Sequence, residues 1–157
     1  MKAASINEIK QELHVIAPAK LLELCIRLAK YKKENKELLS YLLFEAHDEG
    51  AFIESVKRDM DIQFADINQS SLYFVKKSLR KILRVAGKYI RHTGSKQSEV
   101  ELLLYFCSLL KDSSIPFHRS IVLNNQYHSQ LKKIDKVIGT LHEDLQYEYL
   151  KELKKLE

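Results

Sequence analysis

Histidine and acidic side chains are the groups in this sequence that could bind a metal or catalyse proton transfer. The chain contains six histidines, but none has a glutamate three residues before it, as the Glu-x-x-His motif of a di-iron helical bundle requires. It also contains neither the H-E-x-x-H motif nor the paired C-x-x-C motifs of zinc sites. The sequence therefore predicts none of these metal centres.

The densest group of possible metal ligands is the segment 45–49, which reads Glu-Ala-His-Asp-Glu. It lies at an expected junction between two helices. Acidic side chains at such a junction stabilise the N-terminus of the following helix. We interpret the segment as capping and solvated, with a metal site as the alternative.

The remaining catalytic motifs are also missing. The four glycines, at positions 50, 87, 94 and 139, are isolated, so the chain has no glycine-rich loop for phosphate, and no G-x-S-x-G motif occurs. Cys25 and Cys107 each lie in an apolar helical stretch, where a buried, reduced thiol packs as a small apolar group. The sequence does not indicate an enzyme, and we expect no metal and no cofactor.

The most informative feature is the distribution of charge. No acidic residue occurs between Asp66 and Glu99, although this interval holds eight lysines and arginines. On a helical wheel the seven from Lys76 to Arg91 fall within about 140°, with Tyr73 in the middle of that arc and an apolar stripe opposite. The candidate binding residues on this face are Tyr73, Lys76, Lys77, Arg80, Lys81, Arg84, Lys88 and Arg91.

Three interpretations of this cationic face remain open. In the first, the face is solvated or lies beside the acidic stretch at residues 45–66. In the second, the face binds nucleic acid or another polyanion, because lysine and arginine neutralise phosphates and a tyrosine ring can stack on a base. In the third, the face docks an acidic protein partner. A net charge of +5 and a calculated pI near 9.1 favour the second interpretation only weakly.

The composition predicts an all-α fold. Hydrophobic residues make up 45% and charged residues 30% of the chain, with only four glycines and two prolines. The first eight residues contain no apolar signal segment, and no apolar run approaches the ~18 residues of a membrane span. Two cysteines are too few for a disulfide framework. We therefore expect a cytoplasmic protein without a membrane partner.

Capping residues and apolar periodicity predict eight helices in a single domain over residues 1–157. Ser5 and Glu8 form a capping box, Pro18 suits a first helical position, and Gly94 suits a left-handed helix terminus. Asn35, Asp48 and Pro116 are expected to begin further helices. The helices are expected at about residues 5–16, 18–32, 35–46, 48–67, 71–92, 95–112, 116–138 and 142–157.

The second, third and sixth of these segments are apolar around much of their circumference, so we expect neighbours to cover them on several sides. Two segments also share a pattern, E-L-L-x-Y-[L/F], at residues 37–42 and 101–106. This pattern indicates an internal duplication of residues 18–46 and 71–111. It favours an α-α superhelix of helical hairpins, HEAT-like, over an irregular multi-helix bundle.

A helical array without catalytic motifs typically presents a binding surface. The sequence therefore favours a non-catalytic helical interaction module of the cytoplasm with a protein partner. The alternative is a polyanion- or nucleic-acid-binding protein that uses the basic face of residues 71–92. An enzyme whose site is not visible in the sequence is the third possibility.

Overall fold

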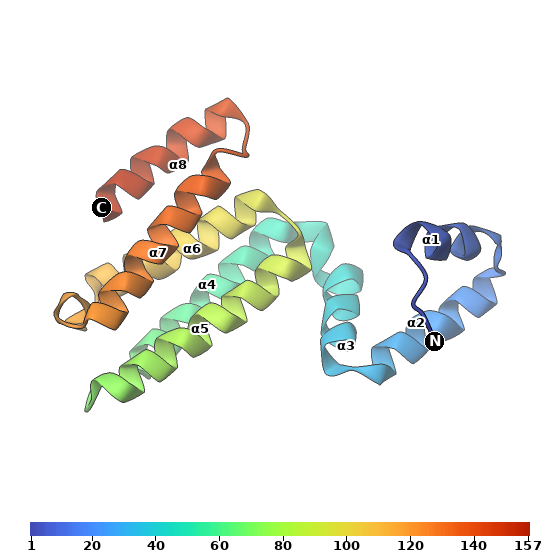
Figure 1. The fold of residues 1–157 in the computed structure, drawn as a ribbon, viewed down its shortest axis with the longest axis horizontal. Coiled ribbons are helices and arrows are strands. Elements are labelled where there is room, and N and C mark those ends of the chain that lie inside the picture. Colours follow the sequence, from blue (N-terminus) through green and yellow to red (C-terminus); the bar gives the residue numbers. More distant parts are fainter. The chain divides into compact units, whose positions relative to one another are not determined.

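The structure is a computed structural model that describes residues 1–157. Helix accounts for 83% of the chain and there is no strand, which confirms the predicted all-α class with about eight helices (Figure 1). The α-helices are α1 (Ile6–Val15), α2 (Pro18–Tyr31), α3 (Lys33–Ser40), α4 (Glu49–Ala65), α5 (Leu72–Thr93), α6 (Lys96–Asp112), α7 (Ile121–Ile138) and α8 (Glu143–Leu156). None of them combines the length and apolar character needed to cross a bilayer.

The chain gathers into two compact units, which we call the N-terminal unit (residues 1–45) and the C-terminal unit (residues 46–157). The sequence predicts one domain over residues 1–157 with a duplication of residues 18–46 and 71–111. Apart from residue 46, the two segments of this duplication fall in different units. Each contains two helices in contact, α2 with α3 and α5 with α6. The duplication itself stays a prediction.

Several helix ends follow the predicted capping chemistry. The Ser5 backbone amide donates to Glu8 Oε2 at 2.7 Å and the Glu8 amide donates to Ser5 Oγ at 3.3 Å, which completes the capping box of α1. The Asp48 carboxylate accepts from the Ala51 amide at 3.0 Å and caps α4. Gly94 ends α5 with a φ of 62°, the left-handed conformation that glycine adopts without strain.

Two predicted helix starts are wrong. Asn35 does not cap the third helix, because α3 begins at Lys33 and the Asn35 amide donates instead to the Leu28 carbonyl at 2.9 Å. α3 also ends earlier than expected, in a π-helical turn at Tyr41–Glu45 and a 3₁₀ turn at Ala46–Asp48. Pro116 precedes the 3₁₀ turn Phe117–Arg119, and Ser120 caps α7.

The C-terminal unit is built around α6, which packs against α4, α5, α7 and α8. Of these, α5 also packs against α4, and α7 also packs against α8 (Figure 1). Apolar side chains of α6, including Leu102, Phe106 and Cys107, are completely buried. The expectation that the sixth helix is interior is confirmed.

The N-terminal unit differs. Tyr41 is its only buried residue, and α1, α2 and α3 have no buried side chain. The expectation that the second and third helices are interior is therefore wrong. Leu42, within the third predicted helix, is 55% exposed. Cys25 is half-buried, whereas the prediction of a buried thiol is confirmed for Cys107.

Candidate functional site: the cationic face of helix α5

Helix α5 is oriented by a buried apolar stripe. The Ser71 hydroxyl caps its N-terminus by accepting from the Phe74 amide. Val75, Leu79 and Ile82 are each exposed by 2% or less in the part of the unit where α5 packs against α4 and α6. Because these side chains recur every three or four residues, the opposite side of the helix faces away from the core. Leu72, the first residue of α5, is about half exposed and lies outside this buried stripe.

The structure brings the predicted binding residues together on that opposite side. Tyr73 is 65% exposed, and Lys77, Arg80, Lys81, Arg84 and Arg91 are also exposed, while Lys76 and Lys88 are half-buried. A shallow hollow of about 410 Å³ lies between their side chains near the N-terminal half of the helix. It is lined by Tyr73, Lys76, Lys77, Arg80, Lys81 and Arg84.

Most of this charge is not neutralised within the protein. Six of the seven cations have no carboxylate oxygen within 4.0 Å of their nitrogen atoms: Lys76, Lys77, Arg80, Lys81, Arg84 and Arg91. The acidic stretch before α5 is engaged in part elsewhere. Glu54 pairs with Lys57 at 2.7 Å, and Asp61 accepts a hydrogen bond from the Tyr105 hydroxyl at 2.6 Å. The six cations are therefore available to an external anion.

A second hollow, which our sequence reasoning missed, crosses α4, α6 and α8. Its volume is about 470 Å³. It is lined by Lys57, Glu101, Leu104, Tyr105, Ser108, Glu148, Tyr149, Glu152, Lys155 and Leu156. We call it the polar groove. One sequence signal could have indicated it: Glu101 and Tyr105 are four residues apart in the shared pattern, so they lie on one face of a helix.

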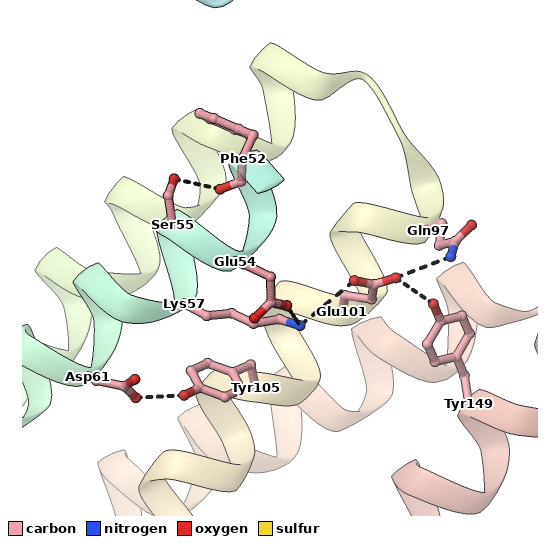
Figure 2. Close-up of polar contacts among 9 residues, drawn as sticks. All are labelled: Phe52, Glu54, Ser55, Lys57, Asp61, Gln97, Glu101, Tyr105 and Tyr149. Atoms are coloured by element: carbon pink, nitrogen blue, oxygen red, sulfur yellow. Dashed lines mark hydrogen bonds and ion pairs between the residues drawn. The ribbon is translucent and has the colours of Figure 1, made fainter. Parts of the chain in front are cut away.

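The Glu101 carboxylate lines the polar groove and takes part in several polar contacts (Figure 2). The Tyr149 hydroxyl donates to its Oε1 atom at 2.7 Å, and the Gln97 side-chain amide donates to the same atom at 3.1 Å. Lys57 Nζ lies 3.9 Å from Oε2 and also pairs with Glu54. Beside it, Tyr105 donates to Asp61 (Figure 2). These bonds link α4, α6 and α8 through their side chains.

Both tyrosines in the groove are held in the neutral form. The hydrogen bond to Asp61 and, secondarily, burial raise the pKa of Tyr105 to about 12. Burial, followed by the hydrogen bond to Glu101, raises the pKa of Tyr149 well above its ordinary value. A tyrosine with a raised pKa donates a hydrogen bond at neutral pH and is a poor general base. We therefore interpret the network as a tie between helices.

The segment 45–49 does not form a metal centre. No group of three or more His, Cys, Asp and Glu side chains in residues 1–157 is placed to hold a metal ion. Within the segment, Asp48 caps α4 as described, and Glu49 accepts a hydrogen bond from the Ser98 hydroxyl of α6. The segment therefore provides a helix cap and a link from α4 to α6.

Comparisons with known proteins do not extend this description. No family model matches the chain, and no curated protein and no solved structure is significantly similar to it. The functional argument therefore depends on the geometry and charge of the chain's own residues.

Proposed function

We propose that this chain is a non-catalytic helical interaction module of the cytoplasm that binds a polyanion, a nucleic acid, through the cationic face of α5. One observation carries the proposal: six cations on one helix face have no carboxylate within 4.0 Å. A structural role for these charges would require internal partners. The face has none for these six, and its cations are mostly exposed.

The geometry of the face suits a phosphate backbone. Lys77 and Arg91 are fourteen residues apart on one helix, which corresponds to ~21 Å along its axis. Duplex DNA carries one phosphate charge per ~1.7 Å of its axis, so several phosphates face a stripe of that length. Each neutralised phosphate releases condensed counterions, and this release supplies most of the affinity of a sequence-independent binder.

Tyr73 adds a possible contact with bases. Its ring is 65% exposed at the edge of the hollow and packs edge-to-face on Phe74, with the ring centroids 5.6 Å apart. An exposed ring held by a neighbour can stack on an unpaired base, and stacking contributes ~1–3 kcal/mol per base. We therefore expect single strands to bind better than duplexes of equal charge.

The test is titration of labelled single- and double-stranded oligonucleotides at several salt concentrations. Wild-type log affinity should fall linearly with log salt, by ~0.9 for each duplex phosphate neutralised. The triple variant Lys77→Glu/Arg80→Glu/Arg84→Glu should lower that slope by about one unit for each contact removed, whatever the nucleotide sequence. Its thermal unfolding should stay close to that of the wild type, because the three side chains have no internal ion pair.

A matched control separates the face from net charge alone. Lys132→Glu/Lys136→Glu/Lys154→Glu makes the same charge change at exposed lysines of α7 and α8 that have no ion pair. The control should bind nearly as well as the wild type. Absence of wild-type binding at low salt, or an equal loss in both triple variants, would contradict the proposal.

One observation favours an acidic protein as a second candidate ligand for this face. Leu72 and Phe74 are 48% and 43% exposed beside Tyr73, and their apolar side chains suit a protein surface better than a phosphate backbone. Leu72→Ser/Phe74→Ser should leave oligonucleotide binding nearly unchanged. A protein ligand identified on the α5 face should instead lose affinity in this variant and show a weaker dependence on salt.

A further inference from the structure

The N-terminal unit exposes far more apolar surface than the rest of the chain. Thirteen large apolar side chains from Ile6 to Phe44 are between 38% and 81% exposed, against seven in the 112 residues of the C-terminal unit. A group of three short helices with one buried residue cannot be held together by its own core. The apolar faces of α1, α2 and α3 therefore need a cover.

Part of this exposed surface lines a groove between α2 and α3 with a volume of about 260 Å³. It is lined by Cys25, Leu28 and Ala29 of α2, by Asn35, Leu38 and Leu39 of α3, and by Leu42 of the π-helical turn that follows α3. Its lining is almost entirely apolar. Apolar grooves between helices can receive the apolar side chains of another helix.

The C-terminal unit shows what the same pattern looks like when it is covered. Leu102, Leu103 and Phe106 occupy the positions of the shared pattern that Leu38, Leu39 and Leu42 occupy in the N-terminal unit. The first three are exposed by 3% or less, because α6 packs against four other helices. Leu38 and Leu42 are 38% and 55% exposed.

We propose that the α2–α3 groove and its apolar surroundings form a symmetric interface with the N-terminal unit of a second copy of this chain. Nine of the thirteen residues, from Leu21 to Phe44, belong to α2, α3 and the π-helical turn that follows, which are in contact. At roughly 150 Å² per fully exposed side chain, these nine present on the order of 750 Å² of apolar surface, comparable with the ~800 Å² that each partner buries in a standard interface. A segment without its own core needs a permanent partner, and most permanent oligomers of soluble proteins are symmetric homodimers.

The distribution of charge opposes self-association less through this unit than through the cationic face of α5. Residues 1–45 contain eight lysines and arginines and six glutamates, a net charge of +2, so two copies repel one another weakly there. The cationic face of α5 is not suited to self-association, because its six unneutralised cations would repel the same face of another copy. The dimer contact is therefore placed on the N-terminal unit.

Sedimentation equilibrium of the full chain over a wide concentration range tests the proposal. The wild type should reach twice its 18.4 kDa mass. Leu28→Asp/Leu42→Asp, which places charges at two exposed positions of the groove, should weaken the dimer by about 30-fold or more, as expected at an interface hot spot. The control Ile62→Asp/Ile121→Asp changes side chains of the C-terminal unit that are at least as exposed, and it should not affect the mass.

The thiol of Cys25 provides a second readout that needs no variant. Cys25 lines the groove and is half-buried, whereas Cys107 is completely buried in the C-terminal unit. Labelling of Cys25 by a thiol reagent should accelerate when the protein is diluted below the dimer dissociation constant, while Cys107 stays unreactive. A monomer at every concentration, or labelling of Cys25 that does not change on dilution, would overturn the proposal. Neither result depends on whether α5 binds a polyanion.

Discussion

The two segments that share the E-L-L-x-Y-[L/F] pattern have opposite environments. Residues 101–106 contribute Leu102 and Phe106 to the centre of the C-terminal unit, and neither has any exposed surface. Residues 37–42 contribute only Tyr41 to a buried position. Almost the same side chains at the same spacing thus form a core in one place and an exposed surface in the other. The difference lies in how many helices surround each segment.

This comparison separates what a helical pattern predicts from what it does not. Periodicity predicts which side of a helix is apolar, because side-chain direction follows from the backbone geometry. Whether that side is covered depends on contacts between residues far apart in the sequence. Paired substitutions, one in each unit, test this difference.

The largest expected effect is a cavity in the C-terminal unit. Leu103→Ala should lower the free energy of unfolding by ~2–5 kcal/mol, because Leu103 is 3% exposed and the cavity is enclosed by packed helices. Leu42→Ala, at a 55% exposed position, should cost less than about 1 kcal/mol when the protein is dilute enough to be monomeric. Chemical denaturation followed by circular dichroism measures both. Equal losses would mean that the two segments are packed alike.

Features of the fold that depend on local chemistry could be read from the sequence. The capping box at Ser5, the Asp48 cap and the left-handed Gly94 follow from contacts within four residues. The cationic side of α5 was also predicted, because the positions of its charges depend only on helical periodicity.

Features that depend on long-range contacts could not be read from the sequence. The interior position expected for Leu42 failed because the N-terminal unit supplies no helix to cover it. The polar groove was missed for a related reason. Asp61, Glu101 and Tyr149 are each more than 35 residues apart in sequence, and only the packing of α4, α6 and α8 places them near one another.

A smaller effect is expected from paired helix caps. Asp48→Ala removes the acceptor for the Ala51 amide at the start of α4, and it should cost ~1 kcal/mol of global stability because α4 contributes Ile53 and Val56 to the core. Ser5→Ala removes the equivalent bond in α1, which buries no residue. It should lower helix content near the N-terminus with little change in global unfolding. Denaturation curves and amide hydrogen exchange distinguish the two results.

The smallest expected effect is a dependence of stability on acidic pH, and two glutamates whose pKa values are both lowered, Glu99 and Glu8, provide the comparison that tests it. Burial opposes the ionisation of Glu99, but hydrogen bonds and ion pairs from Lys133 and Lys96, at 3.0 and 3.1 Å, outweigh it and hold the pKa of Glu99 below its ordinary value. Bonds from the Ser5 side chain and backbone lower the pKa of Glu8.

A carboxyl group with a lowered pKa in the folded state stabilises the fold at pH values above its unfolded pKa of ~4.3, and this contribution is lost as the pH falls through the folded pKa. Glu99 is 7% exposed and its partners lie on α6 and α7, so its protonation should weaken the packing of those helices. The free energy of unfolding of the wild type should therefore decrease below about pH 4.3.

In Glu99→Gln, which lacks the titrating group, the decrease should be shallower. Glu8→Gln should leave the global pH dependence unchanged, because Glu8 is exposed on a helix that buries nothing. Denaturation of both variants at several pH values measures the free energy of unfolding against pH. If Glu8→Gln flattened that curve as much as Glu99→Gln, the expected difference between the two units would be wrong.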